Sequence, residues 1–248
     1  MNRIASLLLP LALLAAPAAG GAKPLKKAPA VLNPGKAYVL VEYKLLKNPY
    51  GGFPGSRKTI PLNEGLVLAR YDSALGDIRG RGKAAANPVP AGQEPGEGFR
   101  KTAIARSETS RLFLLEVEPD LWVIQGFGRT SFSLGSYTME LAPGTVTDLG
   151  VVEAEADWAE GQKRPDAGDV IKAAFAGPFA KRPAIAPMRV SFRPRGDSDM
   201  PLPAGIDPSR VRQAAFTPGA RFGNYLGGLV NRIEGVNARA KASAATQQ

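Results

Sequence analysis

Residues 133–158 read SLGSYTMELAPGTVTDLGVVEAEADW, and this stretch decides the fold class. In its first part apolar and polar side chains alternate: one face carries Tyr137, Met139 and Leu141, and the other carries Ser136, Thr138 and Glu140. Successive side chains of a strand point to opposite faces, so this alternation is typical of a half-buried β-strand.

The second part of the stretch, 146–158, predicts another strand. Val152, Ala154, Ala156 and Trp158 are expected to point inward, while Glu153, Glu155 and Asp157 point outward. Between the two strands, Pro143-Gly144 supplies the fixed φ and then the positive φ of a type II turn. We therefore expect the two strands to form a hairpin.

Four further runs have strand character and are bounded by turn residues: 37–43, 66–71, 112–117 and 121–125. They are rich in β-branched, aromatic and aliphatic residues. Short strands at this spacing predict an antiparallel meander, and two such sheets bury each other's apolar faces. The predicted fold is mainly β, an antiparallel β-sandwich over residues 36–160 with a short helical C-terminal annex.

The N-terminal region predicts export. Residues 1–22 combine an early Arg3, an apolar run and a small-residue exit, which is the pattern of a removable signal peptide cleaved between Ala18 and Lys23. Residues 23–35, rich in Pro, Lys and Ala, predict a flexible leader. We expect a soluble periplasmic or secreted protein with no transmembrane segment after the signal is removed.

Three later segments lack strand patterning. Residues 76–98 are Gly, Pro, Ala and charge, which predicts a mobile insertion; Arg79-Gly80-Arg81-Gly82-Lys83 within it lacks the spacing of a phosphate-binding loop. Residues 161–241 predict a Pro-rich segment and two helices packed on the sandwich, at 208–216 behind an Asp207 N-cap and at 224–240. Residues 242–248 predict a disordered tail.

The chain contains neither cysteine nor histidine. Ser-His-Asp and Cys-His catalysis, which need an imidazole, are therefore excluded. The usual zinc ligands are missing too, which leaves oxygen ligands suited to calcium or magnesium. No catalytic, cofactor-binding or metal-binding residue is assigned, no cofactor is expected, and an enzyme is the less favoured interpretation.

Two groups of acidic residues are candidate sites. Glu153, Glu155 and Asp157 project from one strand face and could bind calcium or act as acid and base, but they are more simply its solvated side. Asp197-Ser198-Asp199 begins like a calcium loop and lacks the rest of that motif.

Aromatic residues suggest two further alternatives. Trp122 and Trp158 could form a sugar-stacking platform, although their apolar surroundings favour core packing. Tyr225, next to Asn224 and among Gly223, Gly227 and Gly228, indicates a close contact between the second helix and the sandwich.

Charge is unevenly distributed along the chain. Residues 107–160 hold two basic and ten acidic residues, whereas 181–241 hold eleven basic and four acidic ones. A basic flank of this kind can bind anionic envelope polymers or lipid headgroups, or can simply be solvated and meet the protein's own acidic sheet, which is favoured. Nucleic acid is not an expected partner, because aromatic residues are not interleaved with the charges.

Residues 121–152 contain Gly135-Ser136-Tyr137 leading into a strand, then Ala142-Pro143-Gly144-Thr145-Val146 and Leu149-Gly150. This stretch, about a seventh of the chain, resembles the end of uncharacterised exported β-sandwich domains of Gram-negative bacteria. The resemblance implies a fold and an envelope location, and carries over no catalytic residue.

These observations predict an exported protein of the cell envelope that acts as a non-enzymatic binding or interaction domain. The alternative is a carboxylate-dependent hydrolase acting on envelope polysaccharide. Two carboxyl groups facing each other across a cleft would favour the hydrolase, and an acidic face open to solvent would favour the binding domain.

Overall fold

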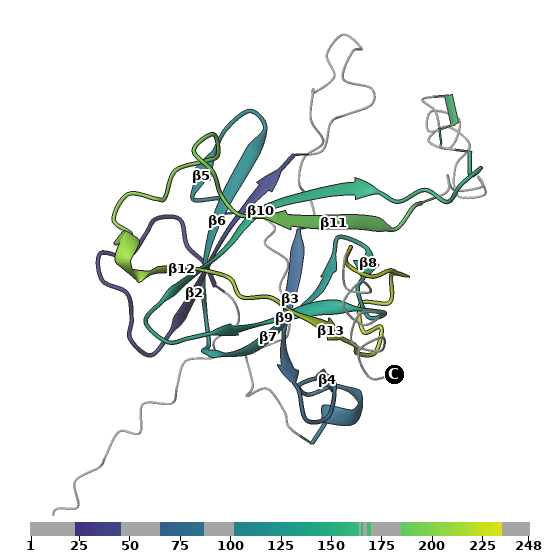
Figure 1. The fold of residues 1–248 in the computed structure, drawn as a ribbon, viewed down its shortest axis with the longest axis horizontal. Coiled ribbons are helices and arrows are strands. Elements are labelled where there is room, and N and C mark those ends of the chain that lie inside the picture. Colours follow the sequence, from purple (N-terminus) through teal and green to yellow (C-terminus); the bar gives the residue numbers. More distant parts are fainter. Residues whose placement is uncertain are drawn as a thin grey trace, which may run out of the picture.

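The computed structural model describes residues 23–45, 65–86, 102–163, 165, 168–169 and 185–234. This part of the chain is mainly β and forms two sheets (Figure 1). The predicted signal peptide, the far half of the 76–98 insertion and the C-terminal tail lie outside the described residues. Within the described ranges, no helix has the length and apolar character needed to cross a membrane.

The first sheet has five strands in its main path and two more attached to it. The path runs β1 (Lys23–Pro24), β6 (Ser110–Val117), β2 (Ala37–Lys44), β10 (Val146–Ala156) and β11 (Met188–Arg193). β5 (Ala105–Arg106) also pairs with β6, and β12 (Val211–Gln213) also pairs with β10. β10 is parallel to both β2 and β12, so the sheet is mixed. The purely antiparallel arrangement predicted from the sequence is therefore wrong for this sheet.

The second sheet runs β13 (Thr217–Ala220), β9 (Ser136–Leu141), β7 (Asp120–Phe127), β3 (Leu66–Asp72) and β4 (Asp77–Ile78). β8 (Thr130–Ser131) pairs with β7, and β14 (Leu229–Val230) lies parallel to β8. Most pairs in this sheet are antiparallel, as β7 with β3 and β9 illustrates.

One apolar core joins the two sheets. Val39 and Val41 of β2 belong to the same buried cluster as Leu68 of β3 and Ile124 of β7. The opposite face of the first sheet is buried as well, because residues around 25–32 and 200–211 cover Tyr38, Leu40, Leu112, Leu114 and Val146. β2 is therefore buried on both faces, which explains its nearly uninterrupted apolar sequence.

The predicted hairpin between the strands of 133–158 is wrong. The turn itself forms: Gly144 has φ +66° and its N–H donates to the Lys36 carbonyl at 2.7 Å. However, β9 belongs to the second sheet and β10 to the first, so the turn carries the chain between sheets. β9 finds its partners in β7 and β13, while β10 pairs with β2, β11 and β12.

The predicted helical annex is also wrong across residues 185–234. Asp207 does act as an N-cap, accepting from the Ser209 N–H at 2.9 Å, but only a 3-10 turn follows (Pro208–Arg210) before β12 begins. Residues 224–234 contain β14 and no helix. Open edges of β10 and β8 offer ladder hydrogen bonds to these segments, and the glycines at 227 and 228 weaken a helix.

Two segments expected to be flexible are held in place. In 23–35, β1 pairs with β6, and Leu25, Ala28 and Leu32 pack on the first sheet. In 76–86, β4 pairs with β3 and is followed by a 3-10 turn (Gly82–Ala84). Overall composition does not reveal that such segments are ordered, because a few apolar residues are enough to anchor them.

Candidate functional site

A charged cluster lies on the outer face of the first sheet. Tyr38, Leu40 and Glu42 point to this face, and Glu42 is fully buried under the segment that follows β11. A carboxylate in such a place must be paired and hydrogen-bonded to remain ionised. Glu42 therefore determines what the covering segment has to supply.

Arg195 supplies the main partner. Its Nη1 donates to Oε2 of Glu42 at 2.7 Å, and its Nε and Nη2 donate to the two carboxylate oxygens of Asp148, each at 3.1 Å. The Met200 N–H also donates to Glu42 Oε2, at 3.0 Å. One guanidinium thus ties β2, β10 and the covering segment together.

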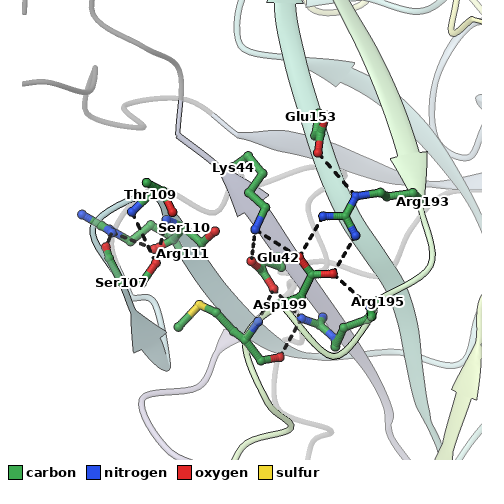
Figure 2. A network of polar contacts seen from close by, with 12 residues as sticks. Glu42, Lys44, Ser107, Thr109, Ser110, Arg111, Glu153, Arg193, Arg195 and Asp199 are labelled. Atoms are coloured by element: carbon green, nitrogen blue, oxygen red, sulfur yellow. Dashed lines mark hydrogen bonds and ion pairs between the residues drawn. The ribbon is translucent and has the colours of Figure 1, made fainter.

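A third carboxylate, Asp199, completes the cluster, and Figure 2 shows it between Lys44 and Arg193. Arg193 binds it with two N–H groups at 2.6 and 2.8 Å, and Lys44 Nζ lies 3.1 Å from it. Lys44 also donates to Glu42 at 3.1 Å. We call Glu42, Lys44, Asp148, Arg193, Arg195 and Asp199 the outer clasp.

Hydrogen bonds and neighbouring charges favour the ionised forms of Glu42, Lys44 and Asp199. Burial acts to raise the pKa of Glu42, but hydrogen bonds, including those from Lys44 and the Met200 N–H, outweigh it and leave that pKa below its ordinary value. Hydrogen bonds from Arg193 and from the Gly196 N–H hold the pKa of Asp199 far below its usual range. Burial lowers the pKa of Lys44, and its bonds to Glu42 and Asp199 more than compensate.

The geometry of the outer clasp indicates a structural role. Its three carboxylates are matched by three cations, and the side-chain oxygens of Glu42 and Asp199 already accept from them. Such a closed arrangement does not offer an acid, a base or a metal ligand to a substrate. It fixes the segment 194–202 against β2 and β10.

The calcium-loop alternative at Asp197-Ser198-Asp199 fails for the same reason. The carboxylate oxygens of Asp199 accept hydrogen bonds from Arg193, Lys44 and the Gly196 N–H. They are therefore not placed to coordinate a metal ion. Within the described ranges, no group of three or more His, Cys, Asp or Glu side chains is placed to hold a metal ion.

The acidic strand face is open to solvent and paired across the sheet. Glu155 lies 2.8 Å from Arg189 and Glu153 lies 3.4 Å from Arg193, and the two glutamate side chains are 65% and 53% exposed. Asp157 accepts from the Asn231 side chain at 3.1 Å. The predicted outward direction of Glu153 and Glu155 is confirmed, with β11 arginines as their partners.

The aromatic candidates have separate roles. Trp122 is buried in the core and its Nε1 donates to the Glu118 carbonyl at 3.0 Å, whereas Trp158 lies beyond β10 and is half-buried. Tyr225 does not mark a helix contact: its hydroxyl donates to Asp77 at 2.8 Å. Asp77 also accepts from the Lys83 N–H at 3.1 Å, so the stretch 79–83 wraps this carboxylate.

An open groove lies between the two sheets and is lined entirely by described residues. Its volume is about 420 Å³, and it is lined by Tyr137, Ser191, Phe192, Phe216, Pro218, Ile233 and Glu234. The Phe216 ring stands 5.2 Å from Phe192 and 5.6 Å from Tyr137, centroid to centroid, so three half-buried rings form its base. This volume falls within the range of ordinary ligand pockets.

The backbone around the groove limits what can bind. The Met188 N–H points away from β10 and donates to Thr130 Oγ1 at 2.8 Å. Residues of an antiparallel strand alternate between bonding to one neighbour and facing the other side, so the N–H and C=O groups of Phe192, four residues later, also point away from β10. Pro194, two residues further, has no N–H to offer at the same edge, and Pro218 interrupts the edge of β13. Proline at these edges disfavours the addition of a long strand.

Sequence reasoning missed both the outer clasp and the groove. A signal for the clasp exists: Glu42 interrupts an otherwise apolar run that is too long for a half-buried strand. The groove had no local signal, because Tyr137, Phe192 and Phe216 come from three distant segments. Comparisons add no assignment: the chain matches no protein-family model, and no curated protein or solved structure is significantly similar to it.

Proposed function

We propose that this chain is an exported β-sandwich domain of the cell envelope that binds another protein, without catalysis, through the groove between β11 and β13. The observation that carries the proposal is the aromatic base of the groove, formed by Tyr137, Phe192 and Phe216. Export rests on the signal-like residues 1–22 and on the resemblance of residues 121–152 to exported sandwich domains.

The acidic groups support binding over hydrolysis. Glycosidases need two carboxyl groups facing each other across the substrate. Here Glu153 and Glu155 lie along one strand and pair with arginines, while Glu42 and Asp199 are enclosed by cations. The polysaccharide hydrolase is therefore the less supported alternative.

The lining of the groove favours a protein partner. Its base is aromatic, and its polar groups are the side chains of Ser191 and Glu234 and the Tyr137 hydroxyl, which already donates to the Glu234 carbonyl at 3.1 Å. Sugars are held by several converging polar groups, whereas an aromatic pocket with a polar rim suits an apolar anchor side chain from a protein. Pro194 and Pro218 favour insertion of side chains over extension of either sheet.

Site-specific photo-crosslinking in a producing bacterium tests the proposal. A photoreactive phenylalanine analogue replaces Ser191, which is exposed at the groove, and Ser209, an exposed serine on the 3-10 turn, serves as the matched control. We expect a discrete protein adduct in the envelope fraction from Ser191 only. Adducts of equal yield at both positions, or none at Ser191, would refute binding at the groove.

Export is tested separately on the same material. Mass spectrometry of the protein from the periplasmic fraction should place its N-terminus between Ala19 and Lys23. Recovery of an intact Met1 species there would refute cleavage.

A further inference from the structure

The segment 23–36 presents lysines outward in a fixed arrangement. Leu25, Ala28 and Leu32 are its anchors on the first sheet, and the Leu25 N–H donates to the Leu114 carbonyl at 2.8 Å. Between the anchors, Lys26 and Lys27 are exposed. The anchors therefore hold both ammonium groups on the outer side of the molecule.

Two more cations belong to the same layer. Lys23 of β1 is exposed at the start of the segment, and Arg210 is exposed on the strip 200–211 that covers the same sheet face. The two strips touch, because a Cβ built on Gly205 would lie 3.8 Å from the Ala28 Cβ. We call Lys23, Lys26, Lys27 and Arg210, together with Val31, the basic layer.

Two carboxylates lie near this layer: Glu116 faces Lys23 in the β1–β6 register, and Asp207 lies close enough to Arg210 for the two charges to interact. Among the described residues, no ion pair joins any of its four cations to a carboxylate. Nearby carboxylates are engaged: Glu118 pairs with Lys36, Glu116 accepts from the Tyr38 hydroxyl at 3.1 Å, and Asp207 caps the 3-10 turn. The arginines that do meet the acidic sheet, Arg189 and Arg193, belong to β11.

Val31 distinguishes this layer from an ordinary solvated surface. Its side chain is 83% exposed, the highest value among the exposed large apolar residues of the described chain. It lies one residue before the anchor Leu32 and in the same short segment as the lysines. An exposed apolar side chain in the same anchored segment as several exposed cations is the composition of a site that rests on a lipid surface, where the apolar side chain enters the headgroup region.

We propose that the basic layer docks the protein on an anionic lipid bilayer, with Lys23, Lys26, Lys27 and Arg210 against headgroup phosphates and Val31 in the interface. The proposal rests on the proposed export for its membrane but not on the groove. A soluble polyanion would use the same cations, yet would gain nothing from Val31. Binding should be reversible and weakened by salt, because few charges are involved.

Flotation of vesicles with the purified processed protein tests the docking. The vesicles contain either phosphatidylcholine alone or an equal mixture with phosphatidylglycerol. We expect binding only to the anionic vesicles, lost when NaCl is raised from about 0.05 to about 0.5 M. The Lys26→Glu/Lys27→Glu variant should bind at least about twentyfold more weakly. The control Arg129→Glu/Lys163→Glu makes the same change in net charge at exposed residues outside the layer and should bind like the parent.

Val31→Ser separates a bilayer from a soluble polyanion. It should weaken vesicle binding severalfold and leave binding to inorganic polyphosphate unchanged. Three results would overturn the proposal: an equal loss of vesicle binding in the Lys26→Glu/Lys27→Glu variant and its control, binding to vesicles of phosphatidylcholine alone, or unchanged vesicle binding by Val31→Ser. Groove crosslinks from Ser191 are scored independently, so failure of one proposal is distinguishable from failure of the other.

Discussion

The guanidinium of Arg195 lies 2.7 Å from the carboxylate of Glu42, which has no solvent exposure. These residues are 153 positions apart in the chain. Their pairing closes the segment after β11 over β2, and the same guanidinium binds Asp148 of β10. The edge of the groove at Phe192 and the position of the strip 200–211 both depend on this closure.

Arg195→Ala should destabilise the protein by about 3 to 5 kcal/mol, because it leaves two buried carboxylates without their shared cation. Urea unfolding measures the change. Arg189→Ala is the matched control: it removes an arginine whose pair with Glu155 is exposed, and it should cost no more than about 1 kcal/mol. Equal losses from the two variants would contradict a structural role for the clasp.

Stability should be nearly constant between about pH 5 and 9 and fall in acid. The pKa values of Glu42 and Asp199 are lowered in the folded state, so their contribution is complete above the unfolded carboxyl pKa of about 4 and is lost as pH falls below it. Thermal unfolding from pH 7 to pH 2.5 measures this. Asp199→Asn should flatten the acid limb, whereas Asp197→Asn, an exposed carboxylate outside the clasp, should leave it steep.

Local patterning predicted the strands well. Expected runs at 37–43, 66–71 and 112–117 correspond to β2, β3 and β6 within about two residues, because alternation and β-branched content are properties of the strand itself. Pairing depends on distant residues and was not predictable in the same way. Pro143-Gly144 forms its turn in either arrangement, so the turn could not reveal that β9 and β10 join different sheets.

The candidate site was predicted less well than the fold, for a related reason. Glu153 and Glu155 were correctly placed outward, since one strand determines that. Their arginine partners lie on β11, which composition marked only as part of a Pro-rich segment. Within residues 185–234, the Asp207-Pro208 cap pattern and the helical spacing of apolar residues after Asn224 predicted two helices. The strands found there are set by the open edges of β8, β9 and β10.

Gly150→Ala should destabilise the protein by more than about 3 kcal/mol. Gly150 has φ +80°, and an added Cβ would collide with the carbonyl of Arg193, a backbone atom that cannot rotate away. Gly161→Ala is the control, since Gly161 has φ +73° with nothing within 4 Å of the added Cβ. That variant bears only the backbone strain of about 1 kcal/mol. Similar unfolding free energies for the two variants would show that β10 and β11 are not in the contact described.

Glu155→Gln tests whether the acidic strand face is surface or site. Glu155 faces Arg189 in the β10–β11 register at 2.8 Å, and both side chains are well exposed. The substitution removes one exposed ion pair, so the free energy of unfolding should change by no more than about 1 kcal/mol.

Calcium provides the decisive measurement for that face. If Glu153 and Glu155 bound the ion, they would have to release Arg193 and Arg189, and bound calcium would stabilise the folded state by mass action. Thermal unfolding of the parent and of Glu155→Gln, each with and without millimolar calcium, separates the cases. We expect the same midpoint in all four samples after allowing for the small effect of the substitution. A calcium-dependent rise in the parent that Glu155→Gln loses would make this face a metal site, and would return carboxylate chemistry to the candidate functions.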